Sequence, residues 1–259
     1  MDKYRDIVIQ EMSKSEYNIN KIIKKRALEI ISASLLFKNN NFTFSSNQII
    51  KKKIDDIIDK LKNDIYTSIY EMAEKAAKTA CEKENYEYDE KVLLAFLSLR
   101  IGNNTLNERI SYYISNFKTE IEAYISIGMM KGLKSLNILN LWDSNKRKPF
   151  QSDDIKKNIG KLAAKGFSKF HYFGKGIESS SFLGLKEIET NNTYQAYNYI
   201  LVTIWHDKGI KGWYSERGSS YPCPICDDEV GIIHPITEYF FGYHLRCCCI
   251  MVPMETENG

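Results

Sequence analysis

The sequence contains no apolar run long enough to cross a bilayer. Its most apolar stretches, residues 30–37 and 92–97, fall short of the roughly 18 to 20 residues that a spanning helix needs. The N-terminus mixes charged and apolar residues and shows no apolar core before a small-residue cleavage site, so we expect no secretory signal. These absences predict a chain with no membrane partner, which works on the side of the membrane where it is made.

The chain also lacks a strong excess of one charge. Its 36 Lys and Arg against 33 Asp and Glu leave a net charge of +3, far below what would by itself indicate nucleic-acid binding. With 259 residues, 43% of them hydrophobic, it is long enough for one large domain or two small ones with a substantial core. Composition therefore predicts a folded protein and names no partner.

Sequence patterns typical of enzymes are missing as well. There is no Gly-x-Ser-x-Gly elbow, no P-loop, and no glycine-rich strand-turn-helix segment to cradle a phosphate. Adjacent acids such as Asp55-Asp56 and Asp227-Asp228 are expected by chance among 33 acidic residues. We therefore expect neither catalysis nor a small-molecule substrate.

The first half of the chain carries a helical pattern. Between Asn47 and about Glu84, apolar residues recur every three or four positions with no Pro or Gly, which predicts one long amphipathic helix capped by Ser45 or Ser46. Residues 4–36 also read as helix, with a break near 14–20. Asp89 is expected to cap a shorter helix that ends at Gly102, and Thr105 with Glu108 to open another that ends near Gly132. Residues 1–136 thus predict an all-helical domain built of long helices.

The second half changes character. Residues 137–151, with the run Lys146-Arg147-Lys148-Pro149, are expected to form a linker, and residues 152–259 a small α+β domain. In that domain we expect a helix over 152–167, turns over 174–184, a helix over 185–205, and strands at 210–216, 231–233 and 249–252. The predicted fold class is α+β and predominantly α-helical.

Cysteines are concentrated near the C-terminus. Five of the six lie between Cys223 and Cys249, where Cys223-Pro-Ile-Cys226 is followed eighteen residues later by His244-Leu-Arg-Cys247. Each half can supply two corners of a tetrahedron, and soft thiolates with one imidazole favour zinc. We expect Cys223, Cys226, His244 and Cys247 to hold a structural zinc ion, because four protein ligands leave no open position for catalysis.

The spacing leaves alternatives to this ligand set. Cys249 replaces His244 if the imidazole points away, while Cys248, on the opposite face of a strand, is expected to pack as a small apolar residue. Reduced thiols without metal, or a disulfide such as Cys223–Cys249, are the other interpretations. We interpret His234 as a turn residue, and His206 and His171 as histidines of the surface or of helix ends.

The C-terminal segment resembles the phage Mu F-like head morphogenesis proteins. The shared features, in order, are a helix at about 185–205, Trp213 on a strand, Cys223-x-x-Cys226, an acidic segment ending at Gly231, and His244-x-x-Cys247-x-Cys249 before Pro253. Two departures are Leu245, where the family has Pro, and Cys248 between the last two cysteines. The resemblance covers about residues 185–253. The helical part is similar only in that these proteins usually carry an N-terminal region of long helices.

This resemblance implies a minor structural protein of a tailed-phage head, made in the cytoplasm of the bacterial host and located in the virion, inside the capsid or at the portal vertex. The implied partners are the portal or the major capsid protein, and packaged double-stranded DNA. Lysines such as Lys51 to Lys53 and Lys146 to Lys148 are the candidates for contact with phosphates.

Two other functions compete with this one. A zinc-containing nucleic-acid-binding protein or nuclease would use His234 or His206 as a general base beside Asp207 or Asp228. A toxin-like effector is the third hypothesis, but the sequence ends six residues after Pro253, which leaves no room for a toxin domain at that end.

Overall fold

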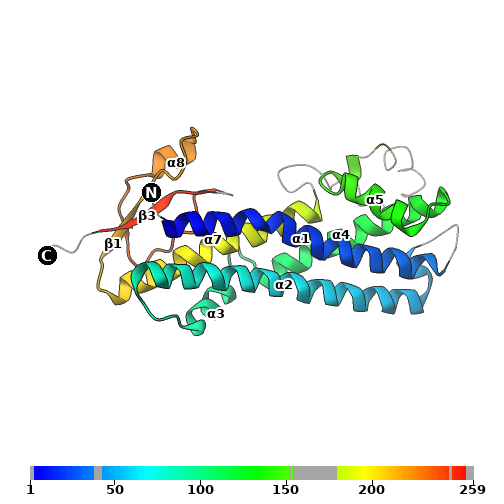
Figure 1. Cartoon of the computed structure of the whole chain (residues 1–259), viewed down its shortest axis with the longest axis horizontal. Coiled ribbons are helices and arrows are strands. Elements are labelled where there is room, and N and C mark those ends of the chain that lie inside the picture. The colour runs from blue at the N-terminus through cyan, green and yellow to red at the C-terminus, as the bar shows by residue number, and fades with distance from the viewer. Residues whose placement is uncertain (1–2, 38–42, 152, 154–179, 245–246, 255–259) are drawn as a thin grey trace. The chain divides into compact units, whose positions relative to one another are not determined.

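We describe a computed structural model of the chain, which covers residues 3–37, 43–151, 153, 180–244 and 247–254 (Figure 1). Helices account for 71% of these residues, and a small three-stranded sheet lies near the C-terminus. The predicted fold class, α+β and predominantly α-helical, is therefore confirmed. The helix expected over 152–167 falls largely outside the described residues.

The chain divides into two compact units, each assembled from separate stretches. Unit 1 contains residues 1–15, 68–106 and 187–259, and unit 2 contains residues 16–67 and 107–186. These units do not follow the boundaries 1–136, 137–151 and 152–259 that the sequence suggested. The reason is that helices α1 (Lys3–Leu35), α2 (Gln48–Glu84) and α7 (Ser181–Asp207) each contribute to both units.

The two long N-terminal helices differ slightly from the prediction. Helix α1 is continuous, so the break expected near residues 14–20 is wrong: Ser15 and Ile19 are fully buried there and packing overrides the weak local pattern. Helix α2 has the predicted extent, but its cap is Asn47, whose side-chain oxygen accepts the backbone N–H of Ile49 at 2.8 Å. A short 3-10 turn, η1 (Phe44–Ser46), precedes it.

Unit 2 packs parts of α1 and α2 against α4 (Leu106–Met130) and α5 (Ser135–Asn145). Its core is aliphatic, with Trp142 of α5 meeting Phe117 of α4 edge to face at 5.7 Å between ring centroids. Gly128 of α4 allows α5 to pack closely at this point, because a Cβ on residue 128 would lie 2.3 Å from the side chain of Ile138. The fully buried aliphatic residues of this core include Ile19, Ile23, Ile30, Ile54, Leu61, Ile65, Ile110 and Ile121.

The segment 137–151, expected to form a linker, is largely helical and packs into the core of unit 2. Most of it is helix α5 followed by the 3-10 turn η2 (Pro149–Gln151), and Ile138, Leu139 and Trp142 are buried. Lys146 donates to Asp143 at 2.7 Å and Arg147 pairs with Glu16. The basic residues and the proline of the run 146–149 suggested a linker, although the apolar residues before them form a face that is buried in unit 2.

A buried carboxyl group supports the start of α7. Glu120 of α4, fully buried, accepts the backbone N–H of Ser181 at 2.8 Å and the Ser181 hydroxyl at 2.7 Å. Burial raises the pKa of Glu120 to about 7, against the smaller lowering effect of these hydrogen bonds. A side chain from another helix thus fills the role of an N-terminal cap. The turn region expected through Gly184 is helical from Ser181 onward.

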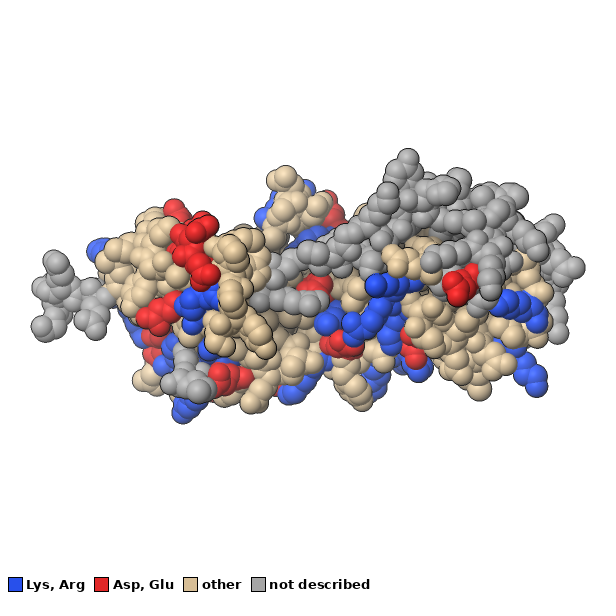
Figure 2. All heavy atoms as spheres, turned by 90° about the horizontal axis from the view of Figure 1, so that it is seen from above, with Lys and Arg blue, Asp and Glu red and all other residues tan. Residues whose placement is uncertain are grey.

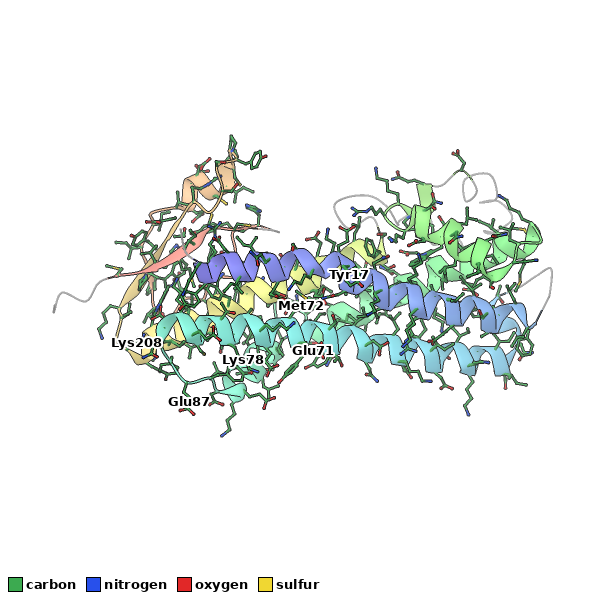
Figure 3. The ribbon with its side chains drawn as sticks, viewed as in Figure 1. Tyr17, Glu71, Met72, Lys78, Glu87 and Lys208 are labelled. Atoms are coloured by element: carbon green, nitrogen blue, oxygen red, sulfur yellow. The ribbon has the colours of Figure 1, made fainter. Side chains whose placement is uncertain are left out.

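Unit 1 surrounds the rest of α7, which is buried on nearly all sides. Some of its buried polar side chains bond within the helix or to a neighbour: the Thr193 hydroxyl donates to the carbonyl of Glu189, and Ser68 of α2 donates to the Glu189 carboxylate at 2.5 Å. Met72 and the small residues Ala73, Ala76, Ala77 and Ala80 of α2 line this interior (Figure 3). Helix α3 (Glu90–Ser98) adds Leu93 and Phe96, and Asp89 caps it as predicted.

The sheet of unit 1 is antiparallel with the order β2-β1-β3. Strand β1 (Gly212–Glu216) lies at its centre, between β2 (His234–Pro235) and β3 (Ile250–Pro253). The first and third strands match the prediction closely, whereas the second lies after residues 231–233. Trp213 of β1 is buried and donates its indole N–H to the carbonyl of Glu238 at 2.9 Å. The chain between β1 and β3 carries the cysteine cluster.

Candidate metal centre

The first half of the cluster lies at the start of a short helix, α8 (Pro224–Glu229). Cys223 directly precedes this helix, and the backbone N–H of Asp227 donates to the carbonyl of Cys223 at 2.8 Å. Pro224 suits the first helical position, since a helix leaves that N–H unbonded. Cys226 is the buried residue of α8, so the helix is anchored mainly through this thiol.

The second half is a tight turn. The backbone N–H of Cys247 donates to the carbonyl of His244 at 3.1 Å, and both side chains lie near Cys226. Gly242, with φ +90°, precedes this turn, and a Cβ there would lie 3.0 Å from the Cβ of Cys247. The chain therefore needs a glycine at this position to pass so close to Cys247.

The two halves meet at Cys226. The Nε2 atom of His244 lies 3.3 Å from Sγ of Cys223 and 3.1 Å from Sγ of Cys226, and Sγ of Cys226 lies 3.9 Å from Sγ of Cys247. In a tetrahedral zinc site with Zn–S bonds of about 2.3 Å, sulfur atoms lie about 3.8 Å apart and sulfur and nitrogen about 3.5 Å apart. The observed separations are close to these edges, so the cluster can hold a metal ion.

The cluster contains one donor more than a tetrahedron needs. The ligand atoms of Cys223, Cys226 and His244 all lie within 4.8 Å of one another, and so do those of Cys226, Cys247 and Cys249. Cys226 is common to both groups. His244 points into the cluster, which removes the reason for which Cys249 was expected to replace it. The fourth ligand is then chosen between Cys247 and Cys249, and both are buried.

The thiols differ in their electrostatic surroundings. Hydrogen bonding by the backbone N–H of Cys226 lowers the pKa of Cys223, and the charge of Arg217 contributes in the same direction. Burial instead raises the pKa of Cys226 well above its ordinary value and also raises the pKa of Cys249. Buried thiolates are stable only beside a compensating positive charge, which a divalent cation would supply.

Arg217, which follows β1, orients the Cys223 half of the cluster. It donates to the carbonyl of Cys223 at 3.1 Å, to the carbonyl of Tyr221, and to the carboxylate of Asp227 at 2.7 Å. One guanidinium therefore fixes the loop before α8 and the first turn of α8 together. No sequence pattern points to Arg217, because only the fold shows which carbonyls face its guanidinium group.

Two further contacts support the Cys247–Cys249 half. The hydroxyl of the buried Tyr194 on α7 donates to the carbonyl of Cys249. A Cβ at Gly218 would lie only 1.6 Å from the carbonyl oxygen of Cys248, so the backbones of the two segments are in direct contact. Cys248 itself is partly buried, and burial raises the pKa of its thiol.

His234 and His206 lie outside the cluster. His234 stacks on Trp213, with ring centroids 4.3 Å apart, and its Nδ1 lies 3.0 Å from a carboxylate oxygen of Glu238. His206 is exposed near the end of α7, 3.7 Å from the carboxylate of Asp207. Neither belongs to the metal-ligand groups found among the described residues. His171 falls outside those residues.

Within the described ranges, no helix combines the length and the apolar character that a membrane crossing requires. Comparison of the chain with protein-family models, with curated proteins and with solved structures gave no match.

Proposed function

We propose that this chain is a minor structural protein of a tailed-phage head whose C-terminal part is held together by a structural zinc ion. The observation that carries the proposal is the convergence of Cys223, Cys226, His244 and Cys247 between strands β1 and β3. The same ordered features, with Trp213 on the preceding strand, are those by which the sequence resembles the Mu F-like head morphogenesis proteins.

Zinc is the proposed ion because the donors are thiolates and an imidazole. Soft ligands at tetrahedral spacing select zinc over magnesium or calcium. The ion would be structural, because the cluster offers enough protein donors to fill four positions without water. Its role would be to fix α8, which buries little besides Cys226, against the strands.

A non-catalytic role is supported by the surroundings of the spare acid and base groups. A nuclease would need a metal with an open position next to a general base. His234 is engaged with Trp213 and Glu238, and His206 is exposed beside Asp207. These arrangements favour the structural role over the nuclease.

The proposed partners are the portal or the major capsid protein. The surface near the metal centre is acidic: Glu216, Asp227, Asp228 and Glu238 are exposed, and acidic side chains gather toward this end of the chain in Figure 2. A zinc ion with three thiolates and one imidazole adds a further net charge of −1. Any contact with packaged DNA would therefore use basic residues elsewhere, such as the exposed Lys51 to Lys53 of α2.

The test is to locate the protein in purified particles of the phage or prophage that encodes it. Quantitative mass spectrometry of intact heads should find it at low copy relative to the major capsid protein, and a reconstruction should place it at the portal vertex or inside the capsid. Its absence from particles would overturn the proposal. For the nuclease alternative, plasmid is incubated with purified protein and Mg²⁺; nicking lost in His234→Ala or His206→Ala would establish an enzyme.

A further inference from the structure

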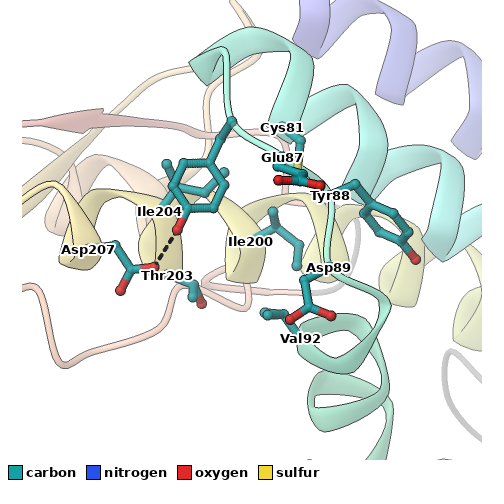
Figure 4. Close-up of a pocket in the computed structure, with 10 residues that line it drawn as sticks. Cys81, Glu87, Tyr88, Asp89, Val92, Ile200, Thr203, Ile204 and Asp207 are labelled. Atoms are coloured by element: carbon teal, nitrogen blue, oxygen red, sulfur yellow. Dashed lines mark hydrogen bonds between the residues drawn. The ribbon is translucent and has the colours of Figure 1, made fainter.

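A pocket of unit 1 lies apart from the metal centre. It has a volume of about 130 Å³ and is formed by the end of α2, the loop that leads to α3, the start of α3, and the last turns of α7 (Figure 4). A cavity of about 150 Å³ accommodates a molecule the size of benzene. This pocket therefore has room for one aliphatic side chain.

The floor of the pocket is apolar. Ile200 and Ile204 of α7 and Cys81 of α2 are all at most 5% exposed, and Val92 of α3 adds a further aliphatic surface. An aliphatic group would gain about 25 cal/mol for each Å² that it removes from water here. A charged or strongly polar group on the floor would lose its hydration without gaining a partner.

The rim of the pocket is acidic. Glu87 and Asp89 come from the loop and Asp207 from the end of α7, and all three residues are exposed. In Figure 4, Asp207 lies on one side of the apolar floor, with Glu87 and Asp89 across from it. The rim therefore presents negative charge on both sides of the space that an aliphatic group would fill.

The loop is held in place by its own contacts. Asn85, with φ +50°, ends α2, and the backbone N–H of Tyr86 donates to the carbonyl of Cys81 at 2.9 Å. The hydroxyl of Tyr86 donates to the carboxylate of Asp207 at 2.8 Å, which joins the loop to α7 across the pocket wall. Two nearby lysines are engaged with other acids: Lys208 pairs with Glu84 and Lys78 with Glu74.

We propose that this pocket docks a segment of a partner protein in which an aliphatic side chain is flanked on both sides by lysine or arginine. The aliphatic group fills the floor, and the flanking cations pair with Asp207 on one side and with Glu87 and Asp89 on the other. The charge of this region fits the partner: residues 82–90, which comprise the loop and the helix ends beside it, hold five acids and one lysine, a net charge of −4. A small ammonium ion could pair with only one side, which favours a polypeptide.

The proposal goes beyond the role in the phage head and does not depend on zinc. It can be tested with three short peptides on the full-length protein: Ac-Lys-Leu-Lys-NH₂, the charge-reversed Ac-Glu-Leu-Glu-NH₂, and Ac-Lys-Gly-Lys-NH₂, which lacks the anchor. Binding is followed by the NMR signals of the methyl groups of Ile200 and Ile204, which report on the floor directly. The first peptide should give saturable shifts with a dissociation constant in the millimolar range, weakened by added salt.

The controls separate the two parts of the proposed interaction. The glutamate peptide should bind at least roughly tenfold more weakly, and the glycine peptide at least about fivefold more weakly. Asp207→Asn should lower the affinity for the first peptide about threefold. Asp59→Asn, which removes an exposed charge of α2 in unit 2, should leave this affinity unchanged. The methyl spectra also show whether each variant is folded. Equal shifts with all three peptides, or none up to about 10 mM, would overturn the proposal.

Discussion

His244 Nε2 lies 3.1 Å from Sγ of Cys226, although eighteen residues separate the two in the sequence. This contact joins the helix α8 to the turn at Cys247, and Cys226 also approaches Cys247 and Cys249. One thiol is therefore shared by every group of candidate ligands. The cluster should depend on Cys226 more than on any other cysteine.

We predict that Cys226→Ser abolishes metal binding. A serine hydroxyl is a much poorer zinc ligand than a thiolate. Loss of the Cys226 thiolate also removes a donor that both groups of candidate ligands share. Elemental analysis should give close to one zinc per wild-type chain and near zero for the variant. The matched control is Cys248→Ser, which belongs to neither group and should keep the full zinc content. If Cys226→Ser retains zinc, Cys226 is not a required ligand and the proposed metal site is wrong.

The choice of the fourth ligand gives a second prediction. The sequence favours Cys247, whose sulfur lies 3.9 Å from that of Cys226. Cys247→Ser should therefore lose zinc, while Cys249→Ser should keep it. Substitution of cobalt for zinc makes the result visible, because the intensity of the thiolate charge-transfer bands follows the number of bound sulfurs. The reverse pattern would assign the position to Cys249.

The candidate metal-binding residues could be identified from the sequence, whereas the residues that hold them in position could not. Cysteine and histidine are rare in this chain, and their spacing restricts which of them can meet, so the cluster could be found from the sequence alone. Arg217 and Gly218 carry no such signal, because their roles depend on which backbone segments the fold places beside them. The same limit explains why α5 was missed, since its apolar face is apparent only once Trp142 is seen against Phe117.

Arg217 provides the third prediction. Arg217→Met keeps much of the side-chain volume but removes the hydrogen bonds to Cys223, Tyr221 and Asp227. Loss of such an orienting contact typically costs about 10- to 100-fold in metal affinity, so zinc should bind at least roughly tenfold more weakly. Competition with a chromophoric chelator measures the change. Lys211→Met, at an exposed position just before β1, is the control, and equal losses in both variants would contradict the assigned role.

The close contact between Gly218 and the carbonyl oxygen of Cys248 gives the fourth prediction. Gly218→Ala places a methyl group against the carbonyl oxygen of Cys248, and backbone atoms cannot move aside as a flexible side chain can. We expect this variant to lose several kcal/mol of stability and to release zinc more readily. Gly209→Ala is the comparison: a Cβ there meets nothing, and its φ of +79° should cost only about 1 kcal/mol. Chemical denaturation of both variants tests the difference, which would be absent if the two segments were not in contact.

The fifth prediction concerns the buried carboxyl group of Glu120. Burial raises its pKa to about 7 in the folded protein, from an ordinary value of 4.5. The folded state then holds a proton that the unfolded state has released, so the contribution of Glu120 to stability is complete below pH 4.5 and is lost as the pH rises to about 7. The loss amounts to about 3 kcal/mol if the full shift is realised.

Glu120→Gln should remove this dependence, because a neutral amide can still meet the hydroxyl and the N–H of Ser181. Its free energy of unfolding, measured in urea with zinc present, should exceed that of the wild type at pH 8 and converge with it near pH 4.5. Taking the difference between the two proteins cancels the pH dependence of zinc binding, which both share. Glu71→Gln, at an exposed position of α2, should run parallel to the wild type (Figure 3). A constant gap between Glu120→Gln and the wild type across this range would show that Glu120 keeps an ordinary pKa despite its burial.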